Sequence, residues 1–289
     1  MALPSTGLCE QEGSRKTIWD AFDLTLNLYW RGSKNEEGAC GAFMAVVKVL
    51  GPGYEVGRID NKVVTALVEG WKREGLAGGT VNRRLAALSK VCKTAHAAGM
   101  TDTPPPKFLR LREAPHRTRV VTEEELGALV EKSGGIYGKL WVFLHETGLR
   151  VSEALSLEWS DVTLRVGASS VTVRESKSGS PRTVPLTRAA EELMRGTLAF
   201  GWSKPFWVDQ HSVNREWESV RAMMGLAGDK EFVPHALRHT CATRLVSNGV
   251  PLAVVQRWLG HKTIAITMRY AHVGDEQVMG AVKALEVSR

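Results

Sequence analysis

The sequence of 289 residues predicts a mainly α-helical protein with a small antiparallel β-sheet, made of an all-helical N-terminal domain and a larger α+β domain. Three observations support this prediction. Apolar residues recur at helical spacing through most of the chain. Two short runs alternate valines with other residues on either side of a glycine-containing turn. Between the two parts, three successive prolines and a basic run interrupt any helix.

The first part contains helical segments that are separated by glycine-containing turns. We expect Thr80 to cap the last of these segments at its N-terminus, and Gly99 to stop it at its C-terminus. The segments with helical periodicity lie at residues 17–30, 41–50, 61–75 and 80–99.

The proline-containing stretch, residues 101–119, is the best candidate for a linker. It reads TDTPPPKFLRLREAPHRTR, and we expect it to bury little and to act as a flexible, basic connector. The predicted domains are therefore residues 1–112 and 113–289.

The second part begins with a Thr-x-x-Glu capping box formed by Thr122 and Glu125. Two strands are expected at 169–176 and 182–187, on either side of the turn KSGSP, because valines alternate with other residues there. Helical spacing is found at residues 122–132, 137–148, 150–159, 189–200, 212–225, 235–249, 251–260 and 263–273.

Composition and charge indicate which classes of partner this chain can bind. The formal net charge is +7 and the sequence pI is about 9.3, so the molecule attracts polyanions such as nucleic acid. The four cysteines lie far apart and form no C-x-x-C pair, which argues against a zinc knuckle or a disulfide framework. No export signal and no run of 18 apolar residues is present, so we expect a cytoplasmic protein that binds DNA and no membrane.

Two short motifs contain side chains suited to phosphate chemistry. Arg150 and Glu153 are three residues apart at a helix start, an arrangement that is usually a surface ion pair. His235 and Arg238 are neighbours on one helical face, whereas His239 is expected to be turned away. Two histidines and an arginine in five residues favour phosphate recognition, but a solvated helix start explains them as well.

Three further residues have an ordinary structural explanation when each is considered alone. Lys177 lies in the tight turn between the two strands, where a lysine is ordinarily only solvated. His261 follows a glycine, and Tyr270 lies on the next helical segment. A tyrosine at helical spacing is more often packed than reactive, and its apolar neighbours are expected to anchor the helix: Ile264, Ile266 and Met268.

Taken together, these residues are more specific than any one of them. Two arginines, two histidines, a lysine and a tyrosine occur without paired carboxylates and without a His/Cys cluster of metal-ligand spacing. Guanidinium and imidazole donors can stabilise the negative charge of a phosphoryl-transfer transition state without a metal ion. A positioned tyrosine oxygen could attack and store the phosphate as a covalent ester. The set therefore predicts phosphoryl transfer that needs no metal and no other cofactor.

The motifs that carry these residues resemble the catalytic domain of the tyrosine recombinases, the phage integrase family. The resemblance covers roughly residues 118–275 and rests on TGLRVSEALSLEWSDV, SKSGSPRTVPL and HALRHTCATRLVSNGVPLAVVQRWLGHKTIAITMRYAHV. It implies site-specific cleavage and rejoining of DNA. By this resemblance, Arg150 and Arg238 would bind the scissile phosphate. His261 would donate a hydrogen bond to one of its oxygens, and Lys177 would protonate the leaving 5′ oxygen.

The resemblance also implies roles for the remaining residues. Tyr270 would attack to give a 3′-phosphotyrosyl link, and His235 would help to move its proton. Glu153 would orient neighbouring catalytic groups, and His239 would be structural.

The first domain resembles, more weakly, the core-binding (SAM-like) DNA-binding domain of the family. Residues 71–93 contain six basic residues and only one acidic residue, and this excess of positive charge gives sequence-independent attraction to phosphates. A solubilising helix face is the alternative explanation. The six candidates for DNA contact are Lys72, Arg73, Arg83, Arg84, Lys90 and Lys93.

The resemblance further implies a homo-tetramer on double-stranded DNA recombination sites, with accessory DNA-bending or directionality proteins as potential partners. The residues after Tyr270 could dock on a neighbouring protomer or pack in cis. Integration and excision of a phage or mobile element is the favoured function. A Xer-like chromosome or plasmid dimer resolvase is the rival with the same chemistry, and a non-catalytic helical DNA-binding regulator is the rival from another class.

Overall fold

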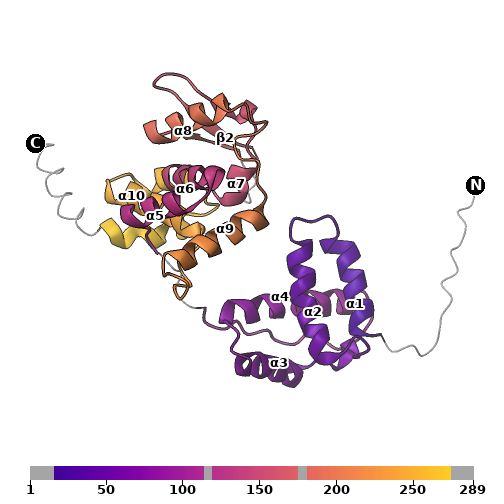
Figure 1. Cartoon of the computed structure of the whole chain (residues 1–289). Helices are drawn as coiled ribbons and strands as arrows, with labels where there is room; N and C mark the ends of the chain where they lie inside the picture. The colour runs from indigo at the N-terminus through magenta and orange to yellow at the C-terminus, as the bar shows by residue number, and fades with distance from the viewer. Residues whose placement is uncertain (1–15, 114–118, 175–180, 275–289) are drawn as a thin grey trace, which may run out of the picture. The chain divides into compact units, whose positions relative to one another are not determined.

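The computed structural model describes residues 16–113, 119–174 and 181–274, and the chain divides into two compact units, Met1–Pro115 and His116–Arg289 (Figure 1). Each unit has its own apolar core. Helices and one small antiparallel sheet make up the described part, so the predicted fold class is confirmed. Among the described residues, no helix is both long and apolar enough to span a bilayer.

The first unit is all-helical. The longest helix, α4, packs against α1 and α2 and presents Val81, Leu88 and Val91 to the core, each with no exposed surface. Phe43 of α2 stacks on Phe22 of α1 at 4.8 Å between ring centroids. Its elements are α1 (Ile18–Thr25), a π-helical segment (Leu26–Trp30), α2 (Glu36–Leu50), a 3₁₀ turn (Val56–Arg58), α3 (Asn61–Arg73) and α4 (Gly78–Ala97).

Helix α4 differs from the prediction at one end. It begins at Gly78 with Ala77 as N-cap, so the expected cap at Thr80 was wrong. Thr80 lies inside the first turn, because the extended backbone of Ala77 (φ −62°, ψ 145°) already ends the preceding loop. The predicted stop is confirmed: Gly99 follows the last helical turn with φ 67°, a conformation that favours glycine.

The first half of the predicted linker is docked on the helical unit rather than free. The Asn82 side chain accepts a hydrogen bond from the Leu111 N–H at 2.8 Å and donates one to the Leu111 carbonyl at 2.9 Å. It also donates to Glu113 at 2.8 Å, and Phe108 packs against the core. The expectation that this stretch buries little is confirmed, since none of residues 101–113 is buried, but its end is held by a single amide side chain and is not a free connector.

The second unit contains the sheet and the other helices. Its helices are α5 (Glu123–Lys132), α6 (Gly135–Thr147), α7 (Val151–Leu155), α8 (Arg188–Ala199), α9 (Gln210–Met223), α10 (His235–Ser247), α11 (Leu252–Leu259) and α12 (Ile264–Thr267), the last of which continues as a 3₁₀ helix (Met268–Gly274). The strands are β1 (Val162–Thr163), β2 (Ser170–Val173) and β3 (Arg182–Pro185). The capping box predicted at Thr122 and Glu125 is confirmed.

The sheet has the order β1-β2-β3 with both pairs antiparallel. Val171 pairs with Val184, and both are fully buried, while Thr172 pairs with Thr183 on the other face. The two predicted strands are confirmed at their centres. The short strand β1 was not predicted, because two residues are too few to show an alternating pattern.

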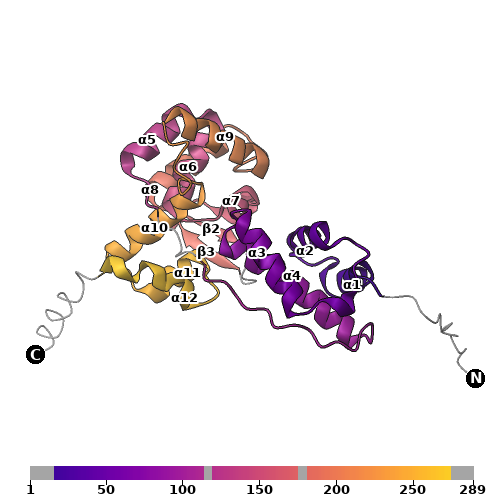
Figure 2. The same cartoon turned by 90° about the horizontal axis from the view of Figure 1, so that it is seen from below.

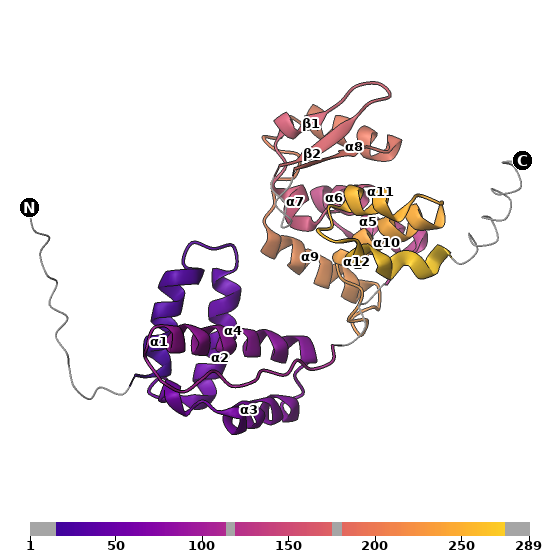
Figure 3. The ribbon, with the colours of Figure 1, turned by 180° about the vertical axis from the view of Figure 1, so that it is seen from behind.

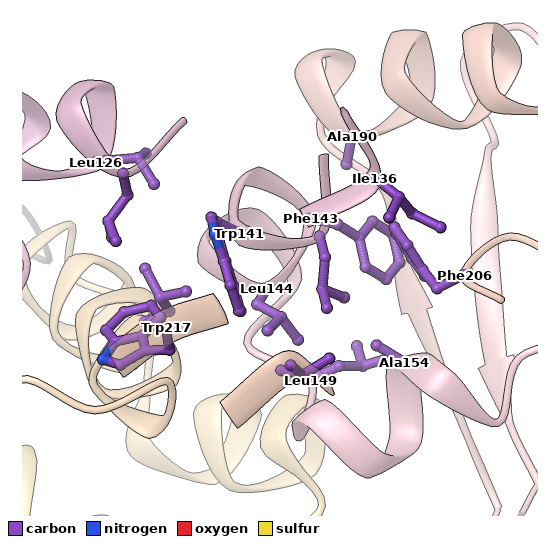
Figure 4. Close-up of a cluster of buried hydrophobic side chains, with 14 of the residues drawn as sticks. Leu126, Ile136, Trp141, Phe143, Leu144, Leu149, Ala154, Ala190, Phe206 and Trp217 are labelled. Carbon is purple, nitrogen blue, oxygen red and sulfur yellow. The ribbon is translucent and has the colours of Figure 1, made fainter. Parts of the chain in front are cut away.

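Helix α6 is the central element of the second unit. In Figures 1 and 3 the sheet and α8 lie on one side of it and α9 on the other, and Figure 2 shows α11 and α12 beside α10. Figure 4 shows Trp141 directed toward Trp217, an edge-to-face pair at 5.0 Å, and Phe143 directed toward Phe206 at 5.2 Å. Because α6 is buried on both sides, its C-terminal end is held rigidly, and the predicted site residues begin there.

Candidate active site

A single buried carboxylate, Glu153, organises the arginines of the site. Its Oε1 accepts a hydrogen bond from Nη1 of Arg150 at 2.7 Å, and its Oε2 accepts the Arg150 backbone N–H at 2.9 Å, which caps helix α7. Arg182 of β3 donates to the same two oxygens at 2.7 and 3.1 Å. Nη1 of Arg238 lies 3.9 Å from Oε2. One carboxylate therefore holds the guanidinium groups of Arg150 and Arg182 by hydrogen bonds and lies within ion-pair distance of a third, that of Arg238.

Arg182 belongs to the site through its hydrogen bonds to Glu153, although the sequence motifs did not single it out. Desolvation alone would raise the pKa of Glu153, but the hydrogen bonds from Arg182 and from the Arg150 backbone lower it to about 2. The signal was present: Arg182 is two residues from Val184, so it lies on the buried face of its strand, where a charge requires a partner. The arginine also fills the space beside Gly260, where an added Cβ would lie 2.9 Å from its Cδ.

Arg238 is almost fully buried, with 2% of its surface exposed. Nη1 donates to the Gly148 carbonyl at 2.7 Å and Nη2 to the Leu259 carbonyl at 2.6 Å, so the guanidinium joins the ends of α6 and α11. Desolvation and the charge of Arg150 lower its pKa to about 9, which leaves it cationic at neutral pH. Gly148 itself has φ 65°, and a Cβ there would lie 2.9 Å from Cδ2 of Leu259 and 3.0 Å from Sγ of Cys241, so glycine allows α6 to end against α10 and α11.

His261 begins the loop between α11 and α12. Its Nδ1 lies 2.9 Å from Oγ1 of Thr267, a buried threonine on α12 that the sequence did not single out. Desolvation and the charges of Arg238 and Arg150 lower the pKa of His261 to about 3. The imidazole is therefore neutral at pH 7 and can donate a hydrogen bond from its other nitrogen if Nδ1 accepts from the threonine.

The two histidines of α10 lie on one face, and the expectation that His239 is turned away was wrong. His235 and His239 are four residues apart, which is close to one helical turn, and their rings meet edge to face at 4.8 Å. Nδ1 of His239 is 2.5 Å from Oη of Tyr270. Part of His235 is exposed to solvent, but the packed side of its ring is desolvated, and this desolvation together with the charges of Arg238 and Arg150 lowers its pKa to about 4.

Tyr270 lies on the 3₁₀ continuation of α12 and is 2% exposed. The expectation that apolar neighbours anchor this helix was wrong: Ile264 and Met268 are 43% and 49% exposed, and Ile266 is only half-buried. A 3₁₀ helix has three residues per turn, so Thr267 and Tyr270 share a face, and both are buried. Burial raises the pKa of Tyr270, which keeps it protonated at neutral pH.

The remaining predicted residues are not among those that the structure brings together around Glu153 and Tyr270. Lys177 lies outside the described residues. On the first unit, Lys72, Arg73, Arg83 and Lys93 are exposed. The guanidinium of Arg84 lies 5.1 Å from the Trp71 ring centroid, and the ammonium of Lys90 lies 3.2 Å from that of Tyr29, so these two cations also pack on aromatic rings.

A basic groove borders the site in the second unit. It is lined in part by Arg182, Arg257, His261 and Lys262, together with Gly260. Across the part of the chain that the structure describes, no three His, Cys, Asp or Glu side chains are grouped as metal ligands would be. The cations and imidazoles near Tyr270 thus define a site suited to a phosphate group, with a tyrosine beside it.

The comparisons with known proteins assign this architecture to a class. Residues 119–277 match the phage integrase family, and the chain belongs to this family of tyrosine-type site-specific DNA recombinases. The tyrosine recombinase XerA of Pyrococcus furiosus is 30% identical over 95% of this chain and 90% of its own length. The tyrosine recombinase XerC of Rhodospirillum centenum is 29% identical over 82% of this chain and 75% of its own length.

Solved structures share the fold. The Tn1549 transposon integrase in complex with a circular intermediate DNA aligns with a TM-score of 0.75 at 16% identity, covering 93% of this chain and 99% of that one. A lambda integrase dimer bound to a core site aligns with a TM-score of 0.70 at 21% identity, covering 88% of this chain and 77% of that one. The prediction of a tyrosine recombinase is therefore confirmed at the level of family and fold.

Proposed function

We propose that this chain cuts and rejoins double-stranded DNA at a defined site through Tyr270. The observation that carries the proposal is the arrangement of the second unit, in which the buried hydroxyl of Tyr270 contacts His239 of α10 while Arg150 and Arg238 lie at the carboxylate of Glu153. Oη of Tyr270 attacks the scissile phosphorus, the bond from phosphorus to the 5′ oxygen breaks, and a 3′-phosphotyrosyl ester remains. The ester conserves the bond energy, so rejoining needs no ATP.

The arginines stabilise the negative charge that develops on the phosphate oxygens. Glu153 holds Arg150 and Arg182 before the substrate arrives, so little reorganisation is required during the reaction. His261, neutral and fixed by Thr267, donates a further hydrogen bond to a phosphate oxygen. Lys177 is assigned to protonating the leaving 5′ oxygen, by its place in the sequence motif.

Duplex DNA is the proposed partner of both units. The exposed cations of α3 and α4 and the groove beside His261 provide phosphate contacts that depend on salt. A homo-tetramer on two duplexes is proposed, with the residues after Tyr270 docking on a neighbour, and with accessory DNA-bending or directionality proteins as further partners. Such a protein would act at the nucleoid of a bacterial host.

Integration and excision of a phage or mobile element is the favoured biological role. The similarity to XerC and XerA supports a second candidate, a chromosome or plasmid dimer resolvase with the same chemistry. The two are distinguished by the sites on which the chain acts. Recombination between two identical copies of one site in a plasmid supports a resolvase, and joining of two unlike sites supports an integrase.

The chemistry is tested with a nicked suicide substrate that carries a candidate core site. Wild type is expected to form a covalent protein–DNA adduct that maps to Tyr270, in the presence of EDTA, while Tyr270→Phe binds the same DNA and forms none. An adduct with the phenylalanine variant would overturn the nucleophile, and strict Mg²⁺ dependence of cleavage would overturn the metal-free mechanism. A non-catalytic regulator predicts DNA binding by both proteins and an adduct with neither.

A further inference from the structure

The hydroxyl of Tyr270 has a defined partner, and that partner is His239. The distance from Oη to Nδ1 of His239 is 2.5 Å, and the two side chains are 2% and 8% exposed. His235 is open to solvent, and it is not among the hydrogen-bond partners of Tyr270 in the described part of the chain. The residue that family resemblance links to the nucleophile's proton is therefore not the residue that touches its oxygen.

The local fold explains this contact. Helix α10 places His239 one turn after His235, further from solvent, and the two rings meet at an interplanar angle of 87°. On the opposite side, the 3₁₀ helix places Thr267 and Tyr270 on one face. Thr267 thereby reaches His261 and Tyr270 reaches His239, so one short helix engages two histidines.

The chemistry requires a proton acceptor at this oxygen. Burial raises the pKa of Tyr270, so the phenol is protonated when the substrate arrives. A phenol is a weak nucleophile until a base takes its proton, and the base must lie within about 2.6–3.2 Å of the oxygen, as a general rule. A neutral imidazole with its proton on Nε2 presents the Nδ1 lone pair to the hydroxyl.

We propose that His239, and not His235, accepts the proton of Tyr270 during the attack on DNA. The O–H bond of the tyrosine breaks and an N–H bond forms at Nδ1, while the oxygen bonds to phosphorus. The bond from phosphorus to the 5′ oxygen breaks, and that oxygen takes a proton from a separate acid, for which Lys177 is assigned above. His235 remains free to face the phosphate. This inference rests on the proposed function.

The test uses His239→Phe in the full chain. Phenylalanine keeps a ring beside His235 and removes the acceptor nitrogen. We expect the single-turnover rate of adduct formation on the suicide substrate to fall by about 100-fold or more, with DNA affinity nearly unchanged. The rate of this variant should also rise about tenfold per pH unit in alkaline solution, because only pre-formed phenolate can attack, whereas the wild-type rate should be flat there.

Two matched variants separate a proton acceptor from a structural residue. His239→Asn places an amide oxygen near the position of Nδ1; it should hold the hydroxyl but cannot take a full proton, so its pH profile should resemble that of His239→Phe. His235→Phe should lower the rate and keep the flat profile of wild type. The inference is overturned if His239→Phe keeps the wild-type rate and profile, or if only His235→Phe shows the rise with pH.

A second measurement does not depend on catalysis. The measurement is an NMR spectrum of protein labelled with ¹³C-tyrosine. The ¹³Cζ resonance of Tyr270 is assigned as the one that is absent from the spectrum of Tyr270→Phe. We expect it to shift in His239→Phe and to stay in place in His235→Phe, and an unshifted resonance in His239→Phe would contradict the contact. Wild type without any adduct refutes the proposed function, whereas a wild-type adduct together with an unaffected His239→Phe refutes this inference alone.

Discussion

The two units of this protein differ in where their charged side chains lie: on the surface of the first unit, and partly in the interior of the second. In the first unit, the polar residues that the structure describes as buried are uncharged: Thr25, Asn82 and Thr94. The second unit buries Glu153 and Arg238 at 4% and 2% exposure, together with His239. The cations of the first unit lie on its surface, where two of them also cover aromatic rings.

This difference reflects two ways of attracting a phosphate. An exposed cation is screened by salt and adds a small, nearly independent increment to binding. A buried cation costs desolvation, so it is stable only when it is paired and hydrogen-bonded, but it is then fixed in place before the substrate arrives. The second unit should therefore respond strongly to single substitutions, and the surface of the first unit should respond weakly.

The largest expected effect is that of Glu153→Gln. The change keeps the shape of the side chain but removes the negative charge that Arg150, Arg182 and Arg238 share. Breaking a buried ion pair costs about 3–5 kcal/mol, so the free energy of unfolding of the second unit should fall by that amount. Hydrogen exchange of its amides in the full chain measures this loss. Glu131→Gln on exposed α5 is the control, and equal effects would contradict the comparison.

Gly148→Ala should follow, with a loss of about 2–4 kcal/mol. The methyl group would require a left-handed conformation and would lie 2.9 Å from Leu259 and 3.0 Å from Cys241. Two controls separate these causes by urea denaturation. Gly167→Ala has positive φ and open space, and should cost about 1 kcal/mol. Gly127→Ala in α5 should be neutral or slightly stabilising, and a Gly148→Ala loss no larger than that of Gly167→Ala would exclude the clash.

Mild acid should weaken the second unit before the first. The folded-state pKa values of His235 and His261 lie below the ordinary value of about 6.5, so the unfolded chain binds more protons below that pH. Their contribution to stability is present above pH 6.5 and is lost progressively as the pH falls toward the folded-state values. The first unit has one histidine, His96. Hydrogen exchange at pH 7 and pH 5.5 should show selective loss of protection in the second unit, and uniform loss would refute this prediction.

The smallest effects should come from the surface of α4. Arg83→Ala and Lys93→Ala each remove one exposed cation, so each should weaken duplex binding a few-fold and reduce the slope of log affinity against log salt by about 0.9. Fluorescence anisotropy at several salt concentrations measures this slope. Lys48→Ala on α2 is the matched control. An unchanged slope in both α4 variants would favour a face that only improves solubility.

Much of the fold followed from local patterns. The helices of the first unit, the box at Thr122 and the stop at Gly99 depend on residues within one or two turns, and the structure has them as expected. The docked linker depends on contacts from far along the chain, such as Asn82 with Leu111, 29 residues apart. Such contacts leave no periodic pattern in the sequence.

The site divides in the same way. The motifs identified Arg150, Glu153, His235, Arg238, His261 and Tyr270 as one set by residue type and order. They missed Arg182 and Thr267, because neither belongs to a dense cluster of charged residues. They also misplaced His239, because the four-residue interval from His235, and not adjacency to Arg238, decides which helical face it shares.

The sequence alone determined most of the helices, the two longer strands, the family and the chemical groups that phosphate chemistry requires, because these depend on residue type, spacing and order. Only the tertiary structure decided which groups touch. Arg182 reaches Glu153 across 29 residues of sequence, and Tyr270 reaches His239 across 31. Those contacts depend on how helices α6, α10 and α11 pack, a property of the whole core that no short stretch of sequence contains.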